Sequence, residues 1–283
     1  MNNIDENVVA GFGKEWNRFD QSNLSQNELK KIFDSWFSIF PWGDISGAAV
    51  GFDLGCGSGR WANFVAPTVG LLHCIDPSAE ALAVARRTLK RHSNCRFHLA
   101  AVENIPLPDE SADFGYSLGV LHHVPNPRAG LKSCTSKLKP GAPFLVYLYY
   151  AFDNRSRWYR AIWRLSDILR KSISRMPDPL RYSISQTIAF LIYLPLARFA
   201  LFFEKLGFNV DILPLSYYRQ RSYYVMRNDA LDRFGTRLEH RFTRVQIQDM
   251  AEDAGLERIV FREEFPYWCA LGYKKCAERR DSD

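Results

Sequence analysis

The segment AVGFDLGCGSG, residues 49–59, constrains the fold of this chain more than any other. Its apolar, β-branched and aromatic first half, Val50 to Leu54, predicts a buried strand. Glycine is needed where the backbone takes positive φ or where a ligand approaches closely, and a helix expected from Arg60 would offer its N-terminal amides to a negative group. The strand ends in three glycines at alternate positions, Gly55, Gly57 and Gly59. The segment therefore predicts a strand, a ligand-binding loop and a helix.

The spacing of these glycines limits which nucleotide the loop can hold. The dinucleotide fingerprint has glycine at its first, third and sixth positions, the last for close packing of helix on strand. Here the sixth position is Arg60, which disfavours a nicotinamide cofactor. A cluster of turn glycines with no ligand is the competing interpretation, so the choice depends on the residues that follow.

The next residues continue an alternation of strands and helices. A second strand, Leu71 to Ile75, ends at Asp76, about 20 residues after the glycines, where a carboxylate can accept both hydroxyls of a ribose. Pro77 and Ser78 then open a helix whose last turn is basic, as suits the negative end of the helix dipole. Further strands are expected at residues 96–100, after Asp113, and in the apolar run that follows the Pro140–Gly141 turn.

Five ordered motifs resemble those of the class I S-adenosylmethionine-dependent methyltransferases: DLGCGSG, CIDPS, VENIPLPDESADF, SLGVLHHVPNP and KLKPGAPFLVY. The resemblance covers residues 49–150 and returns at 240–275. It implies an α/β fold with a Rossmann-like seven-stranded sheet, mostly parallel with an antiparallel last strand, and a helical cap inserted after the fifth strand. The segments it implies are a helical lid, a cofactor-binding core, an inserted cap and the rest of the core, at 1–45, 46–150, 151–239 and 240–283.

The resemblance also implies the cofactor, S-adenosyl-L-methionine, and the residues that bind it. Asp53 and the glycine loop, with Cys56, would hold the methionine end, and Asp76 with Pro77 the ribose. Many relatives carry an acid where this chain has Ala101, so backbone groups or Glu103 would replace that acid at the adenine. The remaining cofactor-binding residues would be Val102 beside the adenine and Ser117, Leu118 and Gly119 beside the methionine amine.

The implied reaction is methyl transfer to a small-molecule or lipophilic acceptor. A general base is useful only when the acceptor must lose a proton. His122, His123 and Tyr217 are the candidates, and the resemblance places His122 opposite the methyl. Imidazole titrates near neutral pH, which suits this role, but one of two adjacent histidines is often simply packed in the core. A nicotinamide-dependent oxidoreductase and a non-catalytic cofactor-binding module remain the alternatives.

The inserted segment 151–239 carries the signals about the acceptor. Residues 153–175 interleave apolar and basic side chains, a pattern that fits contact with an anionic membrane, phosphate binding, or arginines simply exposed to water. Residues 184–203 are strongly apolar, but polar residues and Pro195 interrupt them. We therefore expect a buried lid helix kinked at Pro195, with an interfacial helix that admits a lipophilic substrate as the alternative. Residues 214–235, rich in tyrosine and arginine, could clamp an anionic or sugar-like acceptor.

The N-terminal segment and the composition add weaker constraints. Residues 29–40 place aromatic side chains at helical spacing, which indicates core packing, while Phe12, Trp16 and Phe19 could close the cofactor site. The net charge of +6 allows an anionic partner, but no nucleic-acid-binding signature is present and none is expected to bind. The six cysteines form no CxxC pair, so we expect no metal site and free thiols. The first residues lack a secretory pattern, which predicts a cytoplasmic protein, with peripheral membrane contact left open.

Overall fold

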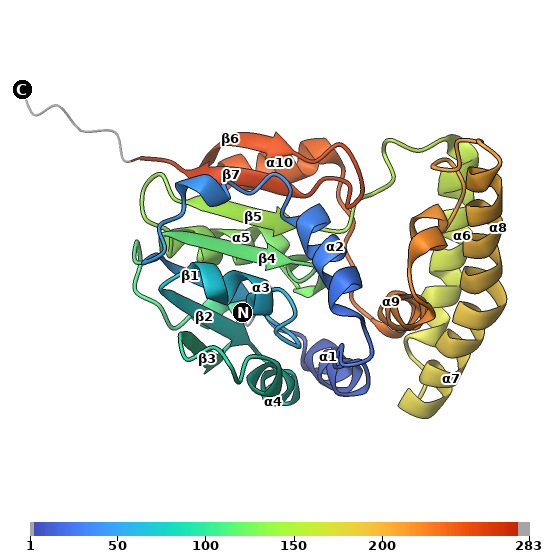
Figure 1. The fold of residues 1–283 in the computed structure, drawn as a ribbon, viewed down its shortest axis with the longest axis horizontal. Helices are drawn as coiled ribbons and strands as arrows, with labels where there is room; N and C mark the ends of the chain where they lie inside the picture. Colours follow the sequence, from blue (N-terminus) through green and yellow to red (C-terminus); the bar gives the residue numbers. More distant parts are fainter. Residues whose placement is uncertain (1–2, 277–283) are drawn as a thin grey trace, which may run out of the picture.

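The structure, a computed structural model, describes residues 3–276. A seven-stranded sheet in the order β3-β2-β1-β4-β5-β7-β6 forms its centre (Figure 1). The first five strands are parallel, and β7 runs antiparallel to both β5 and β6. This confirms the predicted fold class. The strands are β1 (Val50–Leu54), β2 (Leu71–Asp76), β3 (Cys95–Leu99), β4 (Phe114–Leu118), β5 (Pro143–Tyr147), β6 (Leu256–Phe261) and β7 (Ala270–Lys274).

Helices cover both faces of the sheet, and each face has its own apolar core. One core joins the sheet to α2 (Gln26–Trp36), α3 (Ala62–Val65) and α4 (Ala79–Thr88), and the other joins it to α5 (Pro127–Ser136) and α10 (Arg244–Asp253). The helix expected from Arg60 begins later, at Ala62, and α3 has only four residues. The glycine loop is therefore shaped by packing against its neighbours more than by a long helix.

The inserted residues form a helical cap beside the carboxyl ends of the strands (Figure 1). In Figure 1, α9 (Tyr223–Gly235) lies between the sheet and the outer helices, close to α1 (Glu6–Arg18). The outer layer contains α6 (Arg157–Ile173) and a continuous helix made of α7 (Asp178–Ile188), η5 (Ala189–Tyr193) and α8 (Leu194–Lys205). The η5 segment is a π-helical turn directly before Pro195, whose missing N–H and ring disturb the regular hydrogen bonding there.

The outer helix is not buried as the sequence led us to expect. Residues 178–205 form a helix that is long and apolar enough to cross a membrane, with a mean hydropathy of 1.6 over an 18-residue window, yet only 22% of that window is buried. Small side chains, Ala189, Ala197 and Ala200, face inward, whereas the large Phe199 is 53% exposed. The interpretation as a buried lid helix is therefore wrong, because apolar composition alone does not tell which way the large side chains point.

Candidate functional site

A cavity of about 640 Å³ lies where β1, β2, β4 and β5 reach their carboxyl ends. Gly55, Asp76 and Gly119 line it from the sheet side, and Tyr217 and Arg241 line it from beyond β5. Ligands of open α/β sheets bind at this edge, because the loops after parallel strands converge there. The cavity continues from the glycine loop into the cap, so two ligands could meet inside it.

Glycine is required at positions around the cavity for different structural reasons. Gly55 has φ of 74°, and a Cβ there would lie 2.3 Å from the side chain of Val120. At Gly57 a Cβ would lie 2.8 Å from the indole of Trp16, which α1 brings over the loop. Gly119 also has positive φ, 81°, but a Cβ there would meet no atom within 4 Å, although the residue lines the cavity. Gly119 therefore leaves room for a ligand to approach the backbone.

Two aspartates lie at the ends of β1 and β2 and differ in their surroundings. Asp76 lines the cavity, and its two carboxylate oxygens accept the backbone N–H groups of Gly57 and Ser78, each at 2.9 Å. Burial raises the pKa of Asp76 to about 6. Asp53 is buried behind the loop, where burial raises its pKa to about 8 and its Oδ2 has no hydrogen-bond partner among the described residues. Asp76 can contact a ligand directly, whereas Asp53 lies outside the cavity wall.

The other predicted cofactor-binding residues divide in the same way. Pro77, Val102 and Leu118 line the cavity, as does Ala101. Cys56 belongs to the glycine loop but its side chain is buried away from the cavity, and the hydroxyl of Ser117 donates to the carbonyl of Leu54 at 3.1 Å. Three more predicted residues lie outside the cavity wall, namely Gly57, Gly59 and Glu103. Glu103 is therefore not placed to substitute for an acid at Ala101, and the cavity wall there is formed by Ala101 and Val102.

Of the two adjacent histidines, the structure turns the second toward the cavity and the first into the core. His122 is fully buried, its ring stacks on Tyr149 at 3.7 Å, and its Nδ1 accepts the backbone N–H of Tyr149. Burial lowers its pKa well below the usual value. The expectation that His122 faces the methyl is therefore wrong, because the 3₁₀ turn η4 (Leu121–His123) points consecutive side chains in different directions.

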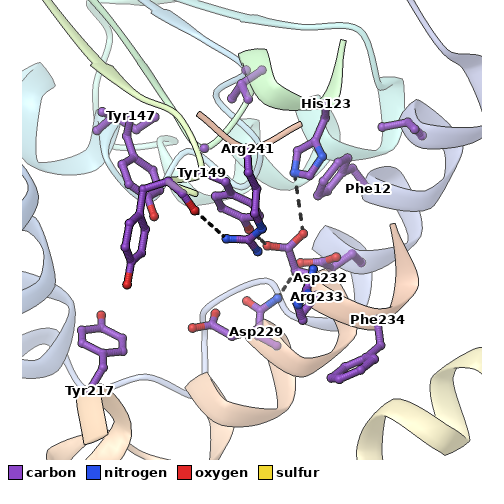
Figure 2. Close-up of a pocket in the computed structure, with 18 of the residues that line it drawn as sticks. Phe12, His123, Tyr147, Tyr149, Tyr217, Asp229, Asp232, Arg233, Phe234 and Arg241 are labelled. Atoms are coloured by element: carbon purple, nitrogen blue, oxygen red, sulfur yellow. Dashed lines mark hydrogen bonds and ion pairs between the residues drawn. The ribbon is translucent and has the colours of Figure 1, made fainter. Parts of the chain in front are cut away.

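His123 lines the cavity and faces Asp232 of α9 (Figure 2). Its Nδ1 lies 2.7 Å from the carbonyl oxygen of Leu238, and its Nε2 lies 3.8 Å from the carboxylate of Asp232. A carbonyl can only accept, so Nδ1 carries the proton and Nε2 keeps its lone pair. Burial lowers the pKa of His123, an effect that Asp232 opposes. The pair therefore provides a neutral imidazole with a carboxylate placed to stabilise its protonated form.

Tyr217, the third candidate, also lines the cavity (Figure 2). Its ring packs against Phe265 at 3.9 Å, and burial raises the pKa of its hydroxyl to about 12. A phenol with so high a pKa is almost entirely protonated at neutral pH, so it can donate a hydrogen bond but is not ready to accept a proton. Tyr217 fits a binding residue better than a base.

Helix α1 closes the cavity from the N-terminal side. Phe12 and Trp16 line it, and Phe12 packs against the ring of His123 at 4.9 Å. Phe19 is buried against Tyr224 instead and does not belong to the cavity wall. Two of the three aromatic residues expected to close the site are therefore placed to do so.

Several charged residues of the cavity were not identified from the sequence. Arg60 lies over the rings of Trp16 and Trp61, at 5.2 and 4.3 Å. Glu15 accepts from Asn228 at 2.6 Å, and Asp229 accepts from the hydroxyl of Tyr218 at 2.9 Å. Burial raises the pKa of Glu15 well above its usual value and that of Asp229 to about 6. These side chains come from α1, the glycine loop and α9, and no local pattern indicated that they would meet.

Comparison with known proteins agrees with this architecture. Residues 52–146 match the family model described as a methyltransferase domain. The match runs from β1 to β5, the part of the chain whose motifs resemble the class I S-adenosylmethionine-dependent methyltransferases. A ubiquinone biosynthesis O-methyltransferase of Glaesserella parasuis is 31% identical over 155 residues, which are 49% of this chain and 62% of that protein. A second such enzyme, of Xanthomonas euvesicatoria, is 32% identical over 36% of this chain and 44% of its own length. The chain thus spans less than two thirds of these curated relatives.

Solved structures of methyltransferases share the fold over nearly the whole chain. An O-methyltransferase family protein of Burkholderia thailandensis has a TM-score of 0.53 at 15% identity, covering 94% of this chain and 59% of that one. A candidate methyltransferase of Bacillus halodurans has a TM-score of 0.52 at 13% identity, covering 87% of this chain and all of its own. At such identities the likeness establishes the class I methyltransferase fold.

Proposed function

We propose that this protein is an S-adenosyl-L-methionine-dependent methyltransferase that acts on a lipophilic small molecule. The observation that carries the proposal is the single continuous cavity, which runs from the glycine loop and Asp76 past His123 into a wall of apolar residues in the cap. A cofactor at the sheet edge and an acceptor in the cap would meet beside His123. The small-molecule methyltransferases among the relatives support the reaction class.

The residues at the sheet edge fit this cofactor. Asp76 faces the cavity at the end of β2, where its carboxylate can accept ribose hydroxyls in addition to the two N–H groups it already holds. The open space over Gly119 suits the close approach of the methionine part, and Ala101 and Val102 border a slot for the adenine. When bound, the cofactor supplies a methyl group that its sulfonium already activates. The chain then has to bind, orient and exclude water.

The cap side of the cavity fits a mainly apolar acceptor with one polar group. Tyr149, Tyr217 and Trp163 belong to its wall, and Ile162 and Leu196 continue it outward. His123 would take the proton from an acceptor hydroxyl at Nε2, while Asp232 stabilises the imidazolium that forms. Asp232 is held for this by the hydroxyl of Tyr149. An O-methyl acceptor of the phenol type uses every one of these groups.

A methyl-transfer assay tests this proposal. The purified protein would be incubated with radiolabelled S-adenosyl-L-methionine and phenols that differ only in the length of an alkyl tail, and the labelled organic product counted. We expect transfer that rises with tail length, and we expect a phenol blocked at oxygen to accept no label. Transfer to the short phenols alone would contradict a lipophilic acceptor. Absence of transfer despite binding of both ligands would favour a non-catalytic binding module.

A further inference from the structure

The large apolar side chains on the surface are concentrated in the cap. Of the 18 exposed large apolar residues among the described residues, 15 lie between Trp158 and Ile212, and only Leu99, Val245 and Val260 lie elsewhere. Single exposed apolar residues are ordinary, but contiguous apolar patches mark interaction surfaces. The cap therefore carries a surface whose cover is not supplied by this chain in the described structure.

The helical positions of these residues place them in one stripe on each outer helix. On α6 the stripe recurs at spacings of three and four, and on η5 and α8 it does the same, so each set occupies one side of its helix. Figure 1 shows α6 and α8 side by side at the edge of the molecule away from the sheet. We call these two stripes the apolar face: Trp158, Ile162, Leu165 and Leu169 with Ile192, Leu196, Phe199, Phe202 and Leu206.

The apolar face surrounds the outer end of the cavity. Ile162, Leu165 and Leu169 of α6, together with Ile192 and Leu196 of the other helix, both line the cavity and are exposed by 41 to 64%. A side chain that is exposed and also lines a cavity belongs to its mouth. The acceptor cavity therefore opens through the apolar face, between the two outer helices.

The charges beside the apolar face are basic. Arg157 and Arg164 are exposed on α6 beside the exposed Ile168, whereas Arg160 lies nearer the inner side of the helix, and none of the three forms an ion pair with a described residue. The single acid of this helix, Asp167, is already paired with Arg170 at 2.6 Å and Lys171 at 3.0 Å. An apolar stripe flanked by unpaired arginines is complementary to a surface with acyl chains below and phosphates above.

We propose that the apolar face docks on an anionic lipid bilayer, so that the cavity takes its acceptor directly from the membrane. Docking is inferred from the exposed apolar face and its arginines alone, whereas delivery of the acceptor rests on the proposed function. Two copies joined through this face would be a poorer match, because a twofold contact brings each patch against itself and closes the cavity mouth. The face lies on the membrane rather than in it as a span.

The inner side of the apolar helix argues against a span. Gln186 and Arg227 of α9 are hydrogen-bonded at 2.5 Å, and Arg198 donates to the carbonyl of Arg219 at 2.9 Å. These contacts tie the helix to α9 and η6 (Ser216–Gln220), so crossing a bilayer would break them and place charged groups in hydrocarbon. One-sided insertion of the outer stripe keeps them all.

Vesicle flotation of the full chain tests the docking. Wild type and the double variant Phe199→Glu/Phe202→Glu, which changes two exposed residues outside the cavity lining, would be floated with vesicles of phosphatidylcholine, with and without phosphatidylglycerol. We expect wild type to float strongly only with the anionic vesicles and the double variant to lose at least tenfold of its bound fraction. The matched control is Val245→Glu/Val260→Glu, which adds the same charges at exposed apolar positions outside the cap and should float as wild type does. Arg157→Gln/Arg164→Gln should remove the preference for anionic lipid.

Several results would overturn the proposal. Docking through this face is excluded if wild type remains with the bulk solution in both vesicle types. It is also excluded if the Phe199→Glu/Phe202→Glu variant floats as wild type does. A lipid-free dimer that the same variant dissociates would assign the face to a second copy instead. Bound protein that resists alkaline extraction would indicate a span. Affinity for S-adenosylhomocysteine, measured on each variant without vesicles, separates docking from the proposed function, because it should not change.

Discussion

The core and the cap of this molecule are held together by different interactions. The sheet and its helices bury two large apolar clusters in which charged side chains are scarce. The cap has a small apolar cluster with ion pairs around it: Glu239 is buried and lies 2.7 Å from both Arg233 and Arg241, and a more exposed pair joins Asp178 to Arg18 of α1 at 2.5 Å. Many large apolar residues of the cap line the cavity or lie on the outer face, so few remain to form an apolar core. Ion pairs therefore contribute more to anchoring the cap than they do in the sheet.

His123 of the core and Asp232 of the cap meet where the two regions join. Substitution of His123 is expected to have the largest effect of the predicted changes. We expect His123→Gln to lower kcat for a phenolic acceptor by about a thousandfold, since loss of a general base typically costs about 10² to 10⁴ in rate. Steady-state kinetics with labelled cofactor would measure this.

His122→Gln is the matched control, because it makes the same substitution one residue earlier, outside the cavity. Its kcat should stay within a few-fold of wild type, although its thermal stability should fall because the ring is buried on Tyr149. Equal losses of kcat in both variants would show that the distinction between the two histidines is mistaken.

Removing the buried charge of Glu239 should loosen the cap without loosening the core. Glu239→Gln leaves Arg241 without its carboxylate and Arg233 with only Asp167, 3.7 Å away, and breaking such a buried pair costs about 3 kcal/mol. We expect faster amide hydrogen exchange in α6 to α9 while β1 to β5 keep their protection. Its neighbours lower the pKa of Glu239, so its contribution is present above the usual glutamate pKa and is lost as the pH falls through the lower native value.

Asp253→Asn serves as the control for that experiment. Asp253 pairs with Arg128 at 2.9 Å on the surface of the core, and such exposed pairs contribute about 0 to 1 kcal/mol. Exchange that rises equally in strands and cap after Glu239→Gln would contradict the separate anchoring of the two regions.

A smaller effect is expected from Gly119→Ala, which tests the core alone. The new methyl group meets no protein atom, so the protein loses only the small amount of stability that an alanine at positive φ costs. The methyl group nevertheless occupies space assigned to the cofactor. We expect about tenfold weaker binding of S-adenosylhomocysteine by calorimetry, since that corresponds to about 1.4 kcal/mol. Unchanged affinity would move the cofactor away from this residue.

The smallest predicted effect is the pH dependence of cofactor binding. Ribose hydroxyls donate to the ionised carboxylate, and the pKa of Asp76 in the free protein is about 6. Affinity should therefore be full above pH 7 and decline several-fold as the pH falls below 6, because the protonated acid must first lose its proton. Asp76→Asn, which cannot ionise, should bind more weakly and show a flatter profile over this range. An equally steep profile in that variant would assign the titration to another group.

The sequence predicted the core far better than the cap, for a physical reason. Strand β1 and the end of β2 at Asp76 follow from short patterns of apolar residues, glycine and a carboxylate, and these patterns act locally. The pairing of His123 with Asp232 joins residues more than 100 positions apart, which no local pattern encodes. The outer helix shows the same limit, since its apolar composition fits burial and exposure equally well. Its orientation depends on small inward side chains such as Ala189 and Ala197, which let α9 pack against η5 and η6 pack against α8.

The cofactor assignment is tested most directly by calorimetric titration of the purified protein with S-adenosylmethionine, S-adenosylhomocysteine and NADH. We expect tight binding of both adenosyl ligands and none of NADH. Asp76→Ala should weaken that binding by about a hundredfold or more, because hydrogen bonds to a charged group contribute about 1.5 to 3 kcal/mol each. Asp109→Ala, which removes an exposed carboxylate beside Lys137, should bind as wild type does. Binding of NADH with no binding of either adenosyl ligand would contradict this assignment and would favour a nicotinamide-dependent oxidoreductase.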